Sequence, residues 1–559
     1  MKNLFCFFSL LLLFVGCKEE KISSEISPQD ATNLENSMAT VDLLNRISGH
    51  SAGNFSSDQT YNLNVIYFVP SDLDPASGFQ QRLSTLMLWT QDWFKQQMHQ
   101  NGYPNTTFGL FTNAAKDNVR LNVIYGSKDK TQYDYNNGSA NIINEVNAFF
   151  SANPSLKTGD HNLIILPAFY MKADGTPGGG PIGPPFYGLG KNCFALDYPG
   201  LDIQYKGNTS TPLGNAFVTW FGGIVHELGH GLNLPHNRQK VSEGNDPQKG
   251  MALMWSGNST IGVSPTFLTG VDAAVLSVNQ VFSKGSTPFY GNTIASFTAV
   301  KANYDNIKQA IIIRGRFQTN NPVKSILCFN DPNVNNEGTG VNKDYNAIGW
   351  AVNPIGQDSF NFEIPIAELV EKGDGMSYEA KLKLVHENGN VTEKVYTYHF
   401  NGGVPIVDFG DKDEYAKTGW EIVGFSSQEL NTSYPGAANR AIDGNLNTYW
   451  HSNWSQNPAS FHPHFIVVDT KQSLEALGVS ISQRQDSQAG RVKDIEIWMS
   501  SDNVNWVKIT NHILQNTSGQ QNISFSSSKT LRYLKIIVQS SYLNAAEKNC
   551  SIAEIGIYK

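Results

Sequence analysis

Cysteine, long apolar runs and excess positive charge are scarce in this sequence, and each shortage excludes a class of protein. Only 5 cysteines occur in 559 residues. Cys193, Cys328 and Cys550 fall in three different predicted domains, so we expect no internal disulfides. The formal net charge of -8 offers no basic surface for nucleic acid. After the first residues, no run reaches the roughly 18 apolar residues that a transmembrane helix needs.

The N-terminal segment MKNLFCFFSLLLLFVGC, residues 1–17, predicts export. Lys2 precedes a short apolar run that is typical of a secretion signal. The run ends in a Phe-Val-Gly-Cys sequence that resembles a bacterial lipoprotein processing box, and the acidic residues that follow resemble the export tag of surface lipoproteins of the Bacteroidota. We therefore expect lipid attachment at Cys17 and a location at the outer membrane or cell surface. A signal peptide without a lipid is the alternative.

One stretch, residues 221–257, contains a complete set of groups for one chemistry. His226 and His230 are four residues apart, so on an α-helix both imidazoles can bind one metal ion. Glu227 follows the first of them, where its carboxylate can take a proton from water and return it to a leaving amine. The alternative is that His226 and His230 are ordinary residues of a buried helix.

A third imidazole, His236, follows six residues after the second and cannot lie on the same helical face. The helix must therefore end between them. Asn233 is a residue type that accepts the left-handed conformation of a helix end, and Pro235 cannot continue a helix. Three imidazoles with one open position are typical of a catalytic zinc site, whereas a structural site has four protein ligands.

These residues resemble the metzincin metalloproteases, whose pattern is H-E-x-x-H-x-x-G-x-x-H, with Asn233 in place of the family glycine. The resemblance implies a catalytic Zn²⁺ held by the three histidines, with Glu227 as general base and acid. It also implies a methionine turn beneath the metal at Met254, with Met251 as the alternative. Ser256 stands where some members have a metal-binding tyrosine, so no tyrosinate ligand is expected. A zinc fold without activity is the alternative.

The chain is predicted to be multidomain. Residues 18–58 are polar and predict a flexible tether. The α+β, metzincin-like catalytic domain follows at 59–286, and within it Cys193–Leu196 is the expected cleft edge that pairs with an extended substrate. Period-two alternation over 287–414 predicts an Ig-like β-sandwich spacer. The remaining residues, 415–559, form the predicted C-terminal module.

The C-terminal module resembles the discoidin-like or coagulation factor type C domains, which include the family 32 carbohydrate-binding modules. The segments that carry the resemblance are AIDGNLNTYWHSNW (441–454), GRVKDIEIWMSSDNVNW (490–506) and SIAEIGIYK (551–559). The resemblance implies a jelly-roll β-sandwich. It also implies a structural Ca²⁺ site with Asp443, Thr448 and Glu554 as side-chain ligands, since hard oxygen ligands suit this ion. A plain turn capped by Asp443 is the alternative.

Sugar recognition requires an apolar ring face together with planar donors and acceptors. His451, Trp454 and Arg484 have these properties and lie where the related modules place ligand contacts, whereas Trp450 is expected in the core. The alternative is that Trp454 is also a packing residue and that this module binds protein or lipid instead.

Together these features predict a surface-anchored zinc endopeptidase that cleaves glycoproteins, mucin-like ones first, with glycans bound by the C-terminal module. Its expected partners are a protein or glycoprotein substrate and glycans, and its membrane attachment is through the lipid alone. The competing hypothesis is a glycan-binding surface adhesin whose zinc domain is not proteolytic.

Overall fold

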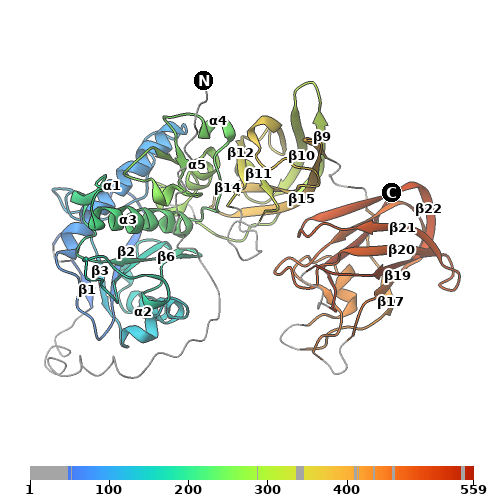
Figure 1. Ribbon diagram of the computed structural model, residues 1–559, viewed down its shortest axis with the longest axis horizontal. Coiled ribbons are helices and arrows are strands. Elements are labelled where there is room, and N and C mark those ends of the chain that lie inside the picture. Colours follow the sequence, from blue (N-terminus) through green and yellow to red (C-terminus); the bar gives the residue numbers. More distant parts are fainter. Residues whose placement is uncertain are drawn as a thin grey trace, which may run out of the picture. The chain divides into compact units, whose positions relative to one another are not determined.

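The computed structural model describes residues 48–51, 53–285, 288–334, 345–407, 412, 414–431, 435–455, 460–542 and 548–559 (Figure 1). The predicted signal segment with Cys17 and most of the predicted tether lie outside the described residues. The chain divides into two compact units. The first contains the described residues up to Gly291 together with those of Val334–Ala347 and Glu387–Asn390, and the second contains the others.

A six-stranded sheet in the order β1-β3-β2-β4-β6-β5 forms the centre of the first unit. The four inner strands run parallel, whereas the short strands at both edges are antiparallel to their neighbours. The inner strands are almost continuously apolar because both faces of a parallel sheet are covered. The six strands of the sheet are β1 (Gly49–His50), β2 (Asn64–Val69), β3 (Asn122–Tyr125), β4 (Asn162–Pro167), β5 (Gly188–Leu189) and β6 (Asn192–Asp197).

Helices cover both faces of this sheet, with α2 on one side and α1 and α3 on the other (Figure 1). Alternate residues of β2 explain the arrangement, because Ile66 and Phe68 join the core beneath α2 and Tyr67 stacks on Phe79 of α1. The remaining elements of this unit are α1 (Phe79–Gln100), α2 (Gly138–Ala152), α3 (Pro212–Gly231), α4 (Val241–Gly244), α5 (Gly270–Leu276), β7 (Met251–Ala252) and β8 (Thr266–Phe267), with 3-10 turns at Lys130–Tyr133, Pro154–Leu156, Gly180–Ile182, Ile203–Tyr205, Gly257–Ser259 and Gln280–Phe282.

The predicted substrate-pairing edge at Cys193–Leu196 is wrong. These residues lie in β6, which is flanked by β4 and, at Cys193, by Gly188 of β5. The glycine-rich chain ahead of β6 folds back as an antiparallel partner, so β5 is the outermost strand on this side of the sheet.

The second unit begins with two packed antiparallel sheets, one of β13-β10-β9 and one that contains β12-β11-β14-β15 with β16 beside β15. Their inward residues form one apolar core, as the period-two pattern predicts. The strands are β9 (Ala295–Asp305), β10 (Ala310–Thr319), β11 (Val323–Pro332), β12 (Ile348–Val352), β13 (Ser359–Pro365), β14 (Ser377–His386), β15 (Val391–Asn401) and β16 (Val404–Ile406), with a 3-10 turn at Ile366–Glu368.

A second β-sandwich follows in the same unit, in which β19 pairs with β17, β22 and β24, and β20 pairs with β21 and β22. Trp450 is fully buried in its core, which confirms its predicted place. The multidomain fold prediction is thus confirmed. The strands are β17 (Glu421–Phe425), β18 (Trp450–His451), β19 (His464–Ser482), β20 (Asp494–Ser500), β21 (Val507–Ile513), β22 (Gln520–Val538), β23 (Ser551–Ile552) and β24 (Glu554–Tyr558), with a 3-10 turn at Ala438–Ile442.

Two further predictions concern the described residues alone. Cys193, Cys328 and Cys550 are all buried and free, as expected from their separation along the chain. None of the helices in the described ranges has the length and apolarity to cross a membrane.

Candidate metal centre and the pocket of the C-terminal module

Helix α3 positions the first two imidazoles. It begins with Thr211, whose hydroxyl accepts a hydrogen bond from the Gly214 amide, and with Pro212 at its first position. It ends at Gly231, and Asn233 takes a positive φ of 71°. The predicted helix end is therefore confirmed, and the chain after it turns back toward the helix.

The three predicted histidines converge after this turn. Their candidate ligand nitrogens all lie within 4.8 Å of one another. Nε2 of His230 is 3.0 Å from Nε2 of His236. Nδ1 of His226 lies 2.8 Å from the Leu253 carbonyl oxygen, and Nδ1 of His230 lies 2.9 Å from that of Leu234. A carbonyl accepts, so each Nδ1 carries the proton and each Nε2 is left with a lone pair.

The donor set fits zinc. Tetrahedral coordination at about 2.0–2.1 Å places ligand nitrogens about 3.3 Å apart, close to the spacing of the His230 and His236 nitrogens. Burial, followed by the nearby His230, lowers the pKa of His226 to about 3. Burial also lowers the pKa of His230. Neutral imidazoles are the form that binds a metal ion, so the surroundings prepare these side chains as ligands. Within the described residues this is the one cluster of at least three His, Cys, Asp or Glu side chains suited to a metal.

Glu227 lies beside the imidazoles on the same helix. Its Oε2 accepts a hydrogen bond of 2.8 Å from the backbone amide of Gly188 in β5. Burial raises the pKa of Glu227 to about 8, although the Gly188 hydrogen bond acts in the opposite direction. A carboxyl group with a pKa near neutrality can both accept and donate a proton at neutral pH.

Gly188 was not among the residues predicted from the sequence. It lies so close to His230 that a Cβ at this position would overlap the histidine Cβ. The glycine-rich composition of residues 174–190 is the signal that could have identified it, because close backbone approach requires glycine. Gly188 therefore lies against helix α3, which carries His226 and His230.

Met254 lies beneath α3. It is fully buried, and a Cβ on Gly229 would come within 2.5 Å of its Sδ. The methionine thus packs against the helix between the turns that carry His226 and His230, which is the position that a methionine turn requires. Met251 lies partly exposed in β7, where its Sδ receives a contact of 3.8 Å from the Gln239 amide.

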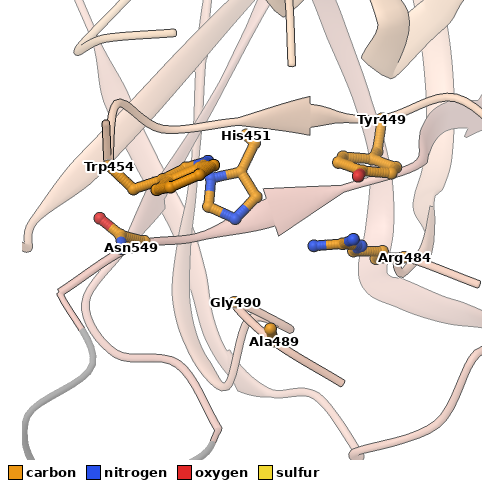
Figure 2. Close-up of a pocket in the computed structure, with 7 residues that line it drawn as sticks. All are labelled: Tyr449, His451, Trp454, Arg484, Ala489, Gly490 and Asn549. Carbon is orange, nitrogen blue, oxygen red and sulfur yellow. The ribbon is translucent and has the colours of Figure 1, made fainter. Parts of the chain in front are cut away.

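The C-terminal module has a pocket of about 270 Å³ that contains all three predicted glycan residues. Figure 2 shows the indole of Trp454 beside the imidazole of His451, and the guanidinium of Arg484 against the ring of Tyr449. The lining residues are Tyr449, His451, Trp454, Arg484, Ala489, Gly490 and Asn549.

The polar groups of this pocket suit hydroxyl ligands. Trp454 lines the pocket and is 41% exposed. Nδ1 of His451 lies 2.7 Å from the Ser452 carbonyl oxygen, which leaves Nε2 as an acceptor, and burial lowers the pKa of this imidazole. Asp486 holds the Arg484 guanidinium by two hydrogen bonds of 2.6 and 3.1 Å.

Four of the lining residues were not predicted from the sequence, and two of these, Tyr449 and Asn549, carry polar groups. Tyr449 is two residues from His451, and strand alternation around the buried Trp450 is a signal that could have identified it. Asn549 carries a buried Oδ1 that has no hydrogen-bond partner within the described part of the chain. An unpaired buried acceptor at a pocket suits a ligand that donates a hydrogen bond.

The predicted calcium ligands lie on one loop and the last strand. The Thr448 hydroxyl donates to Asp443 at 2.6 Å, and the Gly444 amide donates to Glu554 at 3.0 Å. However, the other oxygen of Glu554 pairs with the ammonium of Lys417, so this carboxylate already has a cation. The calcium site remains a prediction, and Asp443 and Thr448 fit it better than Glu554.

The N-terminal part of the chain and its C-terminal module are similar to different known proteins. Residues 423–555 match the F5/8 type C domain. A galactose oxidase of Gibberella zeae is 28% identical over 148 residues, which are 26% of this chain and only 20% of that enzyme.

Two solved structures of OgpA from Akkermansia muciniphila are similar over a larger share. Wild-type OgpA is 33% identical, with a TM-score of 0.56, and the match covers 61% of this chain and 94% of that one. A catalytically inactive OgpA in complex with an O-glycopeptide (glycodrosocin) substrate is 32% identical, with a TM-score of 0.58, over 63% of this chain and 96% of that one. The chain therefore belongs to the family of OgpA, and it carries an F5/8 type C domain in its C-terminal module.

Proposed function

We propose that this protein is a zinc-dependent endopeptidase that cleaves O-glycosylated proteins and binds their glycans through its C-terminal module. The observation that carries the proposal is the convergence of His226, His230 and His236 beside Glu227. The relation to OgpA, whose inactive form was solved with an O-glycopeptide substrate, supports the substrate class.

The residues of the chain divide the work. A zinc ion held by the three imidazoles supplies Lewis acidity toward the scissile carbonyl and toward water. Glu227 takes the proton that water loses on attack and gives it to the leaving amine. The Gly188 amide holds the Glu227 carboxyl in place for both transfers.

The module acts on concentration rather than on chemistry. A weak sugar contact on the same chain raises the local substrate concentration to the order of millimolar without any change in the active site. Trp454 offers a ring face to the apolar side of a sugar, while Arg484, His451 and Asn549 offer polar groups to its hydroxyls.

The central test is Glu227→Gln in the full-length protein. We expect cleavage of an O-glycopeptide to fall by about a hundredfold or more, because a positioned general base contributes roughly 10²–10⁴ in rate. The matched control is Glu371→Gln, which changes an exposed carboxylate. Zinc content, measured by atomic absorption, should stay at one ion per chain in both variants. Undiminished cleavage by Glu227→Gln contradicts the proposal. Stoichiometric zinc without turnover on any glycoprotein would instead favour a surface adhesin.

The module is tested by Trp454→Ala. Loss of sugar stacking on an aromatic ring costs about 0.5–1.5 kcal/mol, so glycan affinity should fall by up to about tenfold. We expect slower cleavage of a mucin-type glycoprotein with many glycans and unchanged cleavage of a short peptide with one glycan at the cleavage site. If Trp454→Ala and the wild type cleave each of the two substrates at the same rate, the module has no targeting role.

A further inference from the structure

A tyrosine from far along the chain lies on the candidate metal site. Tyr345 precedes β12, in the connection that follows β11, and it belongs to the same compact unit as the three histidines. Its ring stacks on the imidazole of His236, with centroids 3.7 Å apart and planes inclined by 22°. This is the shortest of the ring contacts that involve the three histidines in the described residues.

The backbone around Tyr345 is fixed beside the third ligand. The amide of Arg238, two residues after His236, donates to the Ala347 carbonyl at 2.7 Å. Nη1 of Arg238 donates to Asn346 at 3.3 Å, and its guanidinium lies 4.2 Å from the centre of the Trp255 ring. Ala347 is fully buried. The segment that carries Tyr345 is thus held in place by hydrogen bonds to the chain that follows His236.

The three ligands differ in how their rings are held. Helix α3 dictates the side-chain directions of His226 and His230. His236 lies on the chain after the helix end, where no helical geometry fixes its direction. A ring pressed against one face of this imidazole restricts its rotation and shields that face from water.

We propose that Tyr345 is a positioning residue that holds His236 in its metal-binding orientation. The inference rests on the proposed function for its biological meaning, since it concerns the same metal. It also implies that the metal centre is not completed within residues 59–286, because one of its supports comes from the chain between β11 and β12. Groups that orient metal ligands typically change metal affinity or activity 10–100-fold when they are removed.

The test uses full-length Tyr345→Ala and Tyr345→Phe. Zinc affinity is measured by competition with a chromophoric chelator, and the visible spectrum of the Co²⁺-substituted protein reports ligand geometry. We expect Tyr345→Ala to weaken zinc binding about tenfold and to change the Co²⁺ spectrum. Tyr345→Phe keeps the stacked ring, so its affinity should stay within about twofold of wild type. This rescue by phenylalanine separates stacking from a role of the hydroxyl.

Two results would overturn the inference. One is wild-type zinc affinity with an unchanged Co²⁺ spectrum in Tyr345→Ala, and the other is equal damage in the alanine and phenylalanine variants. If Tyr345→Ala does not fold, Tyr345→Leu replaces it, since a flat ring is lost while apolar volume is kept. The outcome is independent of the peptidase test, because Glu227→Gln changes turnover and not zinc affinity.

Discussion

The proposed metal centre and the pocket of the C-terminal module are built in opposite ways. At the proposed metal centre, helix α3 carries His226, His230 and Glu227, and backbone groups of Gly188 and Leu253 form hydrogen bonds to Glu227 and His226. In the pocket, the contributing residues come from three separate stretches of chain, and Trp454 keeps 41% of its surface exposed. At the first site His226 is buried and His230 and His236 are partly buried, whereas the second site includes the exposed Trp454.

This difference in how the side chains are held and exposed suits the two sites to different tasks. Chemistry needs groups held within fractions of an ångström of their productive positions, which a buried helix provides. Capture of a varied glycan needs an accessible ring face and a few polar groups, which loops on a rigid sandwich provide. Changes to the first should therefore affect rate by orders of magnitude, and changes to the second should affect affinity moderately.

The largest expected effect is at His226. His226→Ala removes a buried ligand, and we expect zinc to be lost and kcat/KM on an O-glycopeptide to fall about a thousandfold or more, because the metal contributes several kcal/mol to the barrier. Removal of zinc from wild type by a chelator should give the same loss, and added zinc should restore only the wild type.

His99→Ala is the matched control, because His99 is exposed at the end of α1. Glycan binding by the module should be the same in all these proteins. If a zinc-free His226→Ala protein cleaves at the wild-type rate, the claim that changes at the metal centre alter the rate by orders of magnitude is wrong.

The same contrast explains what could be predicted from the sequence. His226, Glu227 and His230 were predictable because helical geometry converts a four-residue spacing into one face. Asn233 was predictable because its backbone preference is local. The β-sandwich of residues 287–414 was predictable from the alternation of apolar residues, and that of the C-terminal module from its resemblance to the discoidin-like domains.

The remainder depends on contacts between distant segments. No local pattern connects Tyr345 with His236, and none connects Asn549 with Trp454, because both pairs are formed by the folded chain alone. The edge strand was placed wrongly for the same reason, since the pairing of β5 with β6 depends on how an irregular glycine-rich chain folds back.

A smaller effect is expected beneath the end of α3, at His161. Its Nδ1 donates to the Gly231 carbonyl at 2.6 Å, and its Nε2 accepts from the Tyr290 hydroxyl at 2.6 Å. Burial lowers the pKa of His161 to about 4, from an ordinary value of 6.5. The unfolded chain therefore binds more protons between these pH values, so His161 stabilises the fold above pH 6.5 and this contribution is lost as the pH falls toward 4.

The loss amounts to at most about 3 kcal/mol, at 1.36 kcal/mol per pKa unit. Hydrogen exchange of the α3 amides in metal-free protein, measured from pH 7.5 to 4.5, should show a smaller loss of protection on acidification in His161→Gln than in wild type. Identical pH slopes would show that His161 does not couple protonation to the stability of this helix end.

The smallest effect concerns Glu429, which organises the loop of the open pocket. This fully buried carboxylate accepts hydrogen bonds from the amides of Asn431, Trp454 and Ser455 at 2.8, 3.0 and 2.9 Å, and from the Ser455 hydroxyl at 2.6 Å. Burial alone would raise its pKa, but these hydrogen bonds outweigh it and hold the pKa at about 2.

Glu429→Gln replaces one accepting oxygen with a donating NH₂ group, which then faces an N–H or O–H that it cannot accept from. The loop that carries Trp454 must shift, and we expect glycan affinity to fall by a factor of about three to ten, since one charge-assisted hydrogen bond contributes roughly 1.5–3 kcal/mol and the loop recovers part of it by relaxing. Glu421→Gln, which changes a carboxylate that is 62% exposed in the same module, is the control. Titration calorimetry with a mucin-type glycan gives the affinities. Glu429 is not among the residues that line the pocket, so it can act on the glycan only through the loop that carries Trp454. An unchanged affinity would mean that the sandwich itself holds Trp454 in place and that the pocket is as rigid as the metal centre.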